Sequence, residues 1–155
     1  VFDRAEEAFV SADESHKEVI DNPNMDPKVI AASKYLGMLL TGKEENYLQV
    51  YTDSEANEVA FERMEESLPY FSPEFLVKFF DKEIISREEH ILKLKELQEE
   101  DNELAEEYIR KNLTCELDEV YRGAIAIDGR GHFLNSYDGH EYEEEVCGTT
   151  YFIYE

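Results

Sequence analysis

The chain has 155 residues, of which 42% are hydrophobic, so a folded protein with a packed core is expected and a disordered chain is not. Thirty-eight acidic and fifteen basic residues leave a formal net charge of −23, whereas a small domain needs a magnitude of only about 2 to 8 for solubility. Nucleic acids and anionic membranes bind through Lys and Arg patches, so this charge argues against both as direct partners. It favours a basic protein as the partner, or a high-salt environment, although the acids cluster along this chain and do not coat it evenly.

The first third of the chain is expected to be helical. Apolar residues recur every three or four positions over residues 3–20, which is the period of an amphipathic helix. Asp26 followed by Pro27 combines an N-cap residue with proline at the first helical position, so a second helix begins there, and we expect Gly42 to end it. Residues 44–51 are expected to add one or two further helical turns.

Start and stop signals divide the middle of the chain into four more helices. The first covers about residues 52–68, and the second, at 74–82, is short and so apolar that we expect it to be the most buried helix. Ser86 and the glutamate three positions later form a capping box, which opens the longest helix, at 86–113. The last helix, at 114–129, is expected to be capped by its first residue and stopped by its final glycine.

The end of the chain changes character, because glycines and strand-forming residues replace the helical pattern. Residues 130–137 are expected to form a loop or a short strand, and residues 137–140 a turn. Residues 141–146 and 149–154 predict the two strands of an antiparallel hairpin. A lone hairpin is marginally stable, so it must lie on the helices or pair with residues 133–134.

These elements predict a mostly α fold with a small C-terminal antiparallel β hairpin, in the α+β class. We expect a single domain over residues 1–155, in which 1–127 form a helical body and 128–155 a loop and hairpin tail. Two cysteines, Cys115 and Cys147, are too few for a disulfide scaffold, so they are expected to be free thiols in a reducing, cytoplasmic compartment. No apolar run approaches the roughly 18 residues that a membrane helix needs.

Acidic residues concentrate on two of the expected helices and in the run before the hairpin turn. Exposed helix faces are normally charged, but they usually mix Lys with Glu four residues apart for mutual support. Residues 96–107 hold no base, and Asp101 stands where the apolar stripe expects an apolar residue, so it is expected to bend the helix or to leave its middle in solvent. The residues expected to bind a partner are Glu55, Glu58, Glu62, Glu65, Glu66, Glu96, Glu99, Glu100, Asp101, Glu103, Glu106, Glu107, Glu143, Glu144 and Glu145.

Polar residues near the C-terminus suggest an alternative, a small enzyme or a metal-binding protein. His132, Asp138, His140 and Glu141 are types that serve as metal ligands or as an acid and a base. Their spacing matches no metal motif, and the glycines and aspartates among them are also ordinary turn residues. We therefore expect no catalytic residue, no metal and no cofactor.

Short strings in the same region resemble a known group of proteins. They are Asp128-Gly-Arg-Gly-His-Phe-Leu, Ser136-Tyr-Asp-Gly, Glu141 and Tyr151-Phe-Ile-Tyr. Together, from about Val120 onward, they resemble the C-terminus of small uncharacterised proteins encoded by phages and mobile elements. The Cys147-Gly148-Thr149 connection and the final Glu155 depart from the pattern of that group.

The resemblance implies a phage or plasmid origin, and small acidic proteins from such sources often resemble nucleic-acid mimics. A basic channel built for a duplex with one charge per ~1.7 Å would attract a helix that carries many carboxylates. We therefore expect a non-enzymatic inhibitor that acts in a bacterial host on a basic nucleic-acid-binding protein, such as a restriction, repair or CRISPR nuclease. A further alternative is a structural phage protein whose Tyr and Phe surfaces self-associate.

Overall fold

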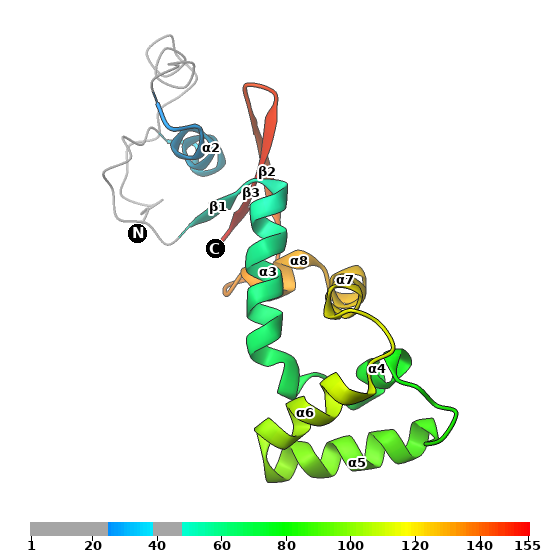
Figure 1. Ribbon diagram of the computed structural model, residues 1–155. Coiled ribbons are helices and arrows are strands. Elements are labelled where there is room, and N and C mark those ends of the chain that lie inside the picture. Colours follow the sequence, from blue (N-terminus) through cyan, green and yellow to red (C-terminus); the bar gives the residue numbers. More distant parts are fainter. Residues whose placement is uncertain (1–24, 39–47) are drawn as a thin grey trace. The chain divides into compact units, whose positions relative to one another are not determined.

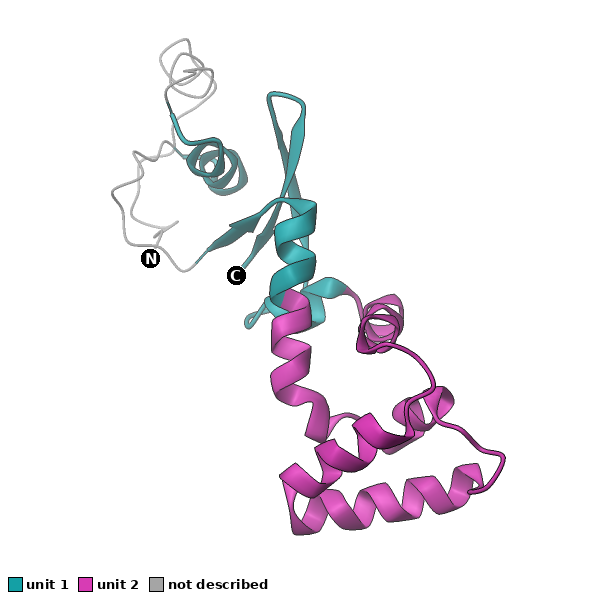
Figure 2. Ribbon diagram, in the orientation of Figure 1, with its two compact units in different colours: residues 1–59, 130–155 teal, residues 60–129 magenta. Residues whose placement is uncertain are grey.

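The computed structural model describes residues 25–38 and 48–155. This part of the chain is mostly helical and carries a small antiparallel sheet, so the predicted α+β fold class is confirmed (Figure 1). The contacts divide the chain into two compact units: unit 1 is Val1–Val59 with Arg130–Glu155, and unit 2 is Ala60–Gly129 (Figure 2). Residues Arg130–Glu155, most of the expected tail, therefore belong to the same unit as the early part of the chain. A single domain over the whole chain stays a prediction, and the helix expected at 3–20 lies outside the described residues.

The sheet of unit 1 joins segments that are far apart in the sequence. Its strands are β1 (Gln49–Tyr51), β2 (Tyr142–Val146) and β3 (Thr149–Tyr154), in the order β1-β3-β2, and both pairings are antiparallel. The hairpin of β2 and β3 is the predicted one. The helical turns expected at 44–51 are wrong for the three residues of β1, and residues 44–47 lie outside the described part.

A two-residue turn sets the register of the hairpin. Cys147 and Gly148 both have positive φ, 51° and 81°, as a type I′ turn requires. The twist of that turn matches the right-handed twist of the strands, so Val146 lies opposite Thr149 and the ladder continues from there. The hairpin packs on helix α2 (Pro27–Leu36), which agrees with one of the two expected arrangements, and its strand partner is β1 and not residues 133–134, the other expected arrangement.

Helix α2 (Pro27–Leu36) begins where the sequence predicts and ends earlier. The side chain of Asp26 accepts a hydrogen bond from Lys28 N over 2.9 Å and so caps the first turn. Gly37 ends the helix in a left-handed conformation, with φ 67°. The predicted end at Gly42 is therefore wrong, because an earlier glycine adopts the helix-ending conformation.

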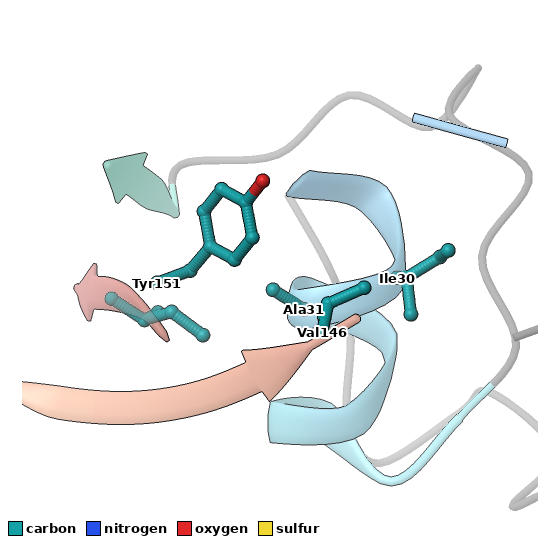
Figure 3. Close-up of a cluster of buried hydrophobic side chains, with 5 residues drawn as sticks. Ile30, Ala31, Val146 and Tyr151 are labelled. Atoms are coloured by element: carbon teal, nitrogen blue, oxygen red, sulfur yellow. The ribbon is translucent and has the colours of Figure 1, made fainter. Parts of the chain in front are cut away.

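One face of the sheet packs on α2 and forms the apolar core of unit 1. Figure 3 shows Ile30 and Ala31 of the helix beside Val146 and Tyr151 of the hairpin, and Ile153 completes this buried cluster. Full burial of a side chain as large as Ile contributes about 1.5–3 kcal/mol, so these contacts hold the helix on the hairpin.

Side chains alternate between the faces of a strand, so Phe152 and Tyr154 lie on the opposite face. The guanidinium of Arg130, the first residue of α8 (Arg130–Leu134), lies over the ring of Phe152, 4.5 Å from its centroid.

Residues Arg130–Leu134 are helical, so the loop or strand expected at 130–137 is wrong for these five residues. The glycines there suggest a turn, but a Cβ on Gly131 would lie 2.5 Å from the carbonyl oxygen of Gly139, so this glycine permits close packing.

Unit 2 is built from helices, with one isolated antiparallel bridge. The boundary between the units falls inside α3 (Asp53–Ser67), which matches the helix predicted at 52–68. The remaining elements are η1 (Leu68–Tyr70), α4 (Pro73–Leu76), η2 (Val77–Phe79), α5 (Arg87–Glu100), α6 (Asn102–Asn112) and α7 (Leu117–Asp128). Residues from several of these helices are fully buried in the core: Met64, Leu68, Leu76, Leu94, Ile109 and Val120.

The longest predicted helix is two helices, α5 and α6, which pack on each other. Ser86 caps α5 as predicted, and its hydroxyl accepts from Glu89 N over 3.2 Å. Asp101 ends α5 in an extended conformation, and its carboxylate accepts from Glu103 N over 2.9 Å, which caps α6. A single helix over 86–113 is therefore wrong, and Asp101 breaks the helix instead of standing within it.

The helix expected at 74–82 ends earlier than predicted, and the helix expected at 114–129 begins later. Phe80 is extended, and its contacts account for both differences. Phe80 forms an isolated antiparallel bridge with Leu113, so the helix expected at 74–82 ends at Phe79. Both the N–H and the hydroxyl of Thr114 donate to Phe79 O over 2.9 Å. The hydroxyl of Thr114 is therefore not the cap of the following helix, which begins after Glu116.

Candidate functional site

The acidic residues of α3 are mostly exposed, but the first of them, Glu55, forms hydrogen bonds within unit 1. The carboxylate of Glu55 accepts from Thr52 N over 2.9 Å and from Lys28 Nζ over 3.0 Å. These two donors, the Thr52 backbone first, lower the pKa of the Glu55 carboxyl. The four acids that follow on α3 are exposed: Glu58 in unit 1, and Glu62, Glu65 and Glu66 in unit 2.

The break at Asp101 gathers an acidic stretch that holds no base at one end of the α5–α6 pair. We call this end the acidic tip, and it holds the seven acids of residues 96–107: Glu96, Glu99, Glu100, Asp101, Glu103, Glu106 and Glu107. All are exposed except the half-buried Glu106. A single long helix would have spread these carboxylates along a rod, whereas the break places three of them on α5, Asp101 at the junction and three on α6.

The acidic tip works against the stability of α5. Glu99 and Glu100 lie in the last turn of that helix, which contains no base. The C-terminus of a helix carries a partial negative charge, so acids there are unfavourable by about 0.3–1 kcal/mol each at low ionic strength. Stability alone therefore does not account for glutamates at these two positions.

Arg110 of α6 joins two of the predicted acidic stretches. Its guanidinium lies 3.4 Å from a carboxylate oxygen of Glu65 on α3 and 3.5 Å from one of Glu106 on α6. The acids of the second half of α3 and those of α6 thus meet at one arginine within unit 2. These contacts are long and partly exposed, so they neutralise little of the surrounding charge.

Tyr121 of α7 lies beside this junction. Its ring packs on Phe61, with the centroids 5.5 Å apart. Its hydroxyl is buried and forms no hydrogen bond with any described residue. Burial, followed by the charge of Glu65, raises the pKa of Tyr121 to about 12, so the hydroxyl stays neutral.

The three consecutive glutamates of β2 do not share one face. Glu143 and Glu145 are exposed, whereas Glu144 lies half-buried on the α2 side with Tyr142 and Val146. Burial raises the pKa of the Glu144 carboxyl, and the smaller effect of Lys34 lowers it. Of this predicted run, the exposed carboxylates are therefore those of Glu143 and Glu145.

Two polar residues near the C-terminus, Arg130 and Glu141, belong to an ion-pair network around the buried guanidinium of Arg130 in unit 1. Arg130, whose side chain is only 8% exposed, donates to Glu141 over 2.6 Å and to the carboxylate of Asp53 over 2.9 Å. It also donates to the side-chain oxygen of Asn57 over 2.9 Å, and the hydroxyl of Tyr154 donates to Glu141. Arg130 and Glu141 therefore link α8, α3 and the sheet, and their charges are used inside the protein.

The histidines of the same region are exposed and lie outside this network. Asp138 accepts from His140 N over 3.0 Å and from the hydroxyl of Tyr142, and these bonds, that of Tyr142 first, lower the pKa of Asp138. His132 packs against the adjacent Phe133, with the ring centroids 5.0 Å apart. Within residues 25–38 and 48–155, no three His, Cys, Asp or Glu side chains are grouped as a metal ion requires.

Comparison with known proteins found no matching family model, no similar curated protein and no similar solved structure. Function must therefore be inferred from the residues themselves. None of the described helices combines the length and the apolar composition that crossing a bilayer requires.

Sequence reasoning missed two cations and one buried histidine. The contacts of Arg110 with Glu65 and of Lys34 with Glu145 O join groups that are distant in sequence, so spacing gives no signal for them, whereas the contact of Arg110 with Glu106 has the i,i+4 spacing of a helix pair. His90 is 1% exposed, and its Nε2 and Nδ1 lie 2.8 Å from Asp81 O and 2.7 Å from the hydroxyl of Tyr108. Its position in the apolar repeat of α5 is the signal that marks it as a core residue.

Proposed function

We propose that the protein is a non-enzymatic acidic binding protein whose acidic tip binds a basic protein that itself binds nucleic acid. The acidic tip carries the proposal, because it groups seven carboxylates with no base between residues 96 and 107. A basic groove that accommodates phosphates attracts such a group, and the attraction accelerates association. A host restriction, repair or CRISPR nuclease would present a groove of this kind.

The unfavourable position of the acids supports the proposal. Glu99 and Glu100 oppose the dipole of α5, and unit 2 as a whole holds nineteen Asp and Glu against nine Lys and Arg. Charge of one sign destabilises the compact state through self-repulsion. A partner that brings positive charge to the acidic tip removes this repulsion in the complex.

The proposal is tested by capturing proteins from a bacterial host lysate on the immobilised chain. We expect a basic nucleic-acid-binding protein to be retained at about 100 mM salt and released at about 500 mM salt, because exposed charges are screened over a shorter distance at higher salt. The captured protein is then titrated with the variant Glu99→Lys/Glu100→Lys, which reverses two charges and leaves the cap residue Asp101 in place.

A matched control separates the acidic tip from net charge. The variant Glu83→Lys/Glu88→Lys makes the same change in charge at two exposed positions near the opposite end of α5. We expect the variant of the acidic tip to weaken binding at least about tenfold, and the control to weaken it much less. Equal affinities for the wild type and the Glu99→Lys/Glu100→Lys variant would disprove the proposal.

A further inference from the structure

Strand β2 is an edge of the sheet. It pairs with β3 on one side, and within residues 25–38 and 48–155 no strand follows it on the other side in the order β1-β3-β2. An edge strand presents backbone N–H and C=O groups to which another chain can add a strand. β2 is therefore a place where a partner segment could extend the sheet.

The hairpin turn shows which backbone groups point outward. Hydrogen-bonded and non-hydrogen-bonded pairs alternate along an antiparallel ladder, and a two-residue turn closes on a hydrogen-bonded pair, here Val146 and Thr149. Glu145 and Glu143 then occupy non-hydrogen-bonded positions, so their N–H and C=O groups point away from β3. One contact agrees with this direction, because Lys34 Nζ donates to Glu145 O over 2.8 Å.

Most of these outward groups are unpaired within the described residues. No described residue accepts from the N–H of Glu143 or Glu145, and none donates to Glu143 O. The side chains of both residues are exposed and form no ion pair with any described cation. Residues 143 and 145 therefore offer a short row of donors and acceptors with a carboxylate at each position.

The two carboxylates decide which segment can pair there. Like charges directly opposite each other across two strands are destabilising, and opposite charges are stabilising. The edge of a second copy of this acidic chain would place glutamates against Glu143 and Glu145. Self-association through this edge is thereby disfavoured, and a strand with Lys or Arg at alternate positions is favoured.

We propose that the open edge of β2 binds an extended basic segment of a partner protein as an added β-strand. The backbone of the segment bonds to the outward N–H and C=O of Glu143 and to the outward N–H of Glu145, whose carbonyl oxygen already accepts from Lys34. Its alternate Lys or Arg side chains pair with the two carboxylates. Lys34 already places an ammonium group at this edge. The inference rests on the proposed function only in taking a basic protein as the partner, since the surface lies in unit 1 and the acidic tip in unit 2.

A defined peptide tests the edge without knowledge of the natural partner. The probe is a capped peptide of alternating Lys and Val, and the control peptide has the same sequence with alternate backbone nitrogens methylated, which removes donors but keeps the charge. Binding is followed on the full chain by the NMR shifts and the hydrogen exchange of backbone amides. We expect exchange of the Glu143 and Glu145 amides to slow at least about tenfold with the probe and not with the control.

Two variants at one position separate backbone pairing from charge. Glu143→Pro removes an outward N–H, which proline tolerates on an edge strand, and leaves the bonds between β2 and β3 in place. Glu143→Gln keeps the N–H and removes the charge. We expect the proline variant to lose peptide binding, and the glutamine variant to bind several-fold more weakly while it still protects the amide of residue 145.

Three results would overturn the inference: no binding of the probe, equal binding of the methylated peptide, or shifts confined to α5 and α6. The last result would still support the acidic tip as a site for basic proteins. Failure of the proposed function is judged separately, by the affinity of the captured protein for the variant Glu99→Lys/Glu100→Lys. Each proposal can therefore fail while the other stands.

Discussion

Arg130 Nε donates to Glu141 Oε1 over 2.6 Å, and this contact ties the first residue of α8 to the residue before β2. Both residues belong to the C-terminal stretch whose polar side chains suggested a metal or catalytic site. The contact gives both of them a structural role. In a chain with a net charge of −23, a buried arginine also offsets some of the repulsion within unit 1.

We expect Glu141→Ala to lower the free energy of unfolding by about 2 kcal/mol. Removal of one partner of a buried pair costs about 3–5 kcal/mol, but Glu141 is 28% exposed and Arg130 keeps Asp53, so the smaller figure applies. Urea unfolding measures the change. Glu145→Ala removes an exposed glutamate two residues before the turn and should change stability by less than about 0.5 kcal/mol. Equal effects of the two variants would contradict the structural role of the ion pair.

The contrast between predicted and missed elements follows from the range of the interactions that form them. The cap at Ser86 and the hairpin turn at Cys147-Gly148 depend on neighbouring residues, so the sequence predicts them. Strand β1 is three residues long and forms by pairing with β3, about a hundred positions later. Helix α8 forms around a buried Arg130, which no local pattern marks. Contacts between distant segments therefore decide these two missed elements, whereas the end of α2 at Gly37 and the break at Asp101 are formed by local contacts.

Two tyrosine substitutions are expected to have opposite effects on stability. Tyr121→Phe removes a buried hydroxyl that has no hydrogen-bond partner among the described residues, so we expect stability to rise by about 1 kcal/mol. Tyr108→Phe removes the hydroxyl that lies 2.7 Å from His90 Nδ1, so this buried ring nitrogen loses its partner while Nε2 keeps its contact with Asp81 O. That variant should lose about 1–3 kcal/mol. Thermal or urea unfolding measures both, and a loss of stability in Tyr121→Phe would contradict the burial of an unpaired hydroxyl.

The two ends of the break at Asp101 should respond oppositely to charge reversal. Glu99 lies in the last turn of α5 and Glu103 in the first turn of α6. Helix dipoles therefore favour Lys at 99 and Glu at 103, each by about 0.3–1 kcal/mol. We expect Glu99→Lys to be more stable than Glu103→Lys, although both variants change the net charge equally. The difference should shrink at high salt, and a difference of the opposite sign would contradict the split into two helices.

The sequence predicts which acidic residues belong to the candidate site, but it does not predict how they are arranged in space. The acids of residues 96–107 are evident from the sequence, whereas their gathering into a tip depends on Asp101 acting as a cap. Either a bend or a solvated helix was compatible with an acid at that position. Glu55 and Glu144 were predicted as surface acids on charge alone, yet the first bonds to Thr52 and Lys28 and the second is half-buried. The surroundings of Glu55 and Glu144 depend on contacts with α2, which the spacing of acids along one helix or one strand does not reveal.

The half-buried Glu144 makes stability depend on pH in a direction that can be worked out. Burial raises the pKa of Glu144 in the folded protein above its ordinary value of 4.5. Above the raised pKa the folded state holds a poorly solvated charge, which lowers stability, and below the unfolded value the carboxyl is neutral in both states. The cost is thus present at neutral pH and disappears as the pH falls below about 4. We expect Glu144→Gln to stabilise the protein at pH 7 and to have no such effect at pH 3.5.

The control is Glu143→Gln, which makes the same change of net charge at the exposed neighbour. The difference in stability between the two variants therefore isolates the effect of burial. Equal stabilisation by both variants at pH 7 would show that net charge, and not the burial of Glu144, determines the effect.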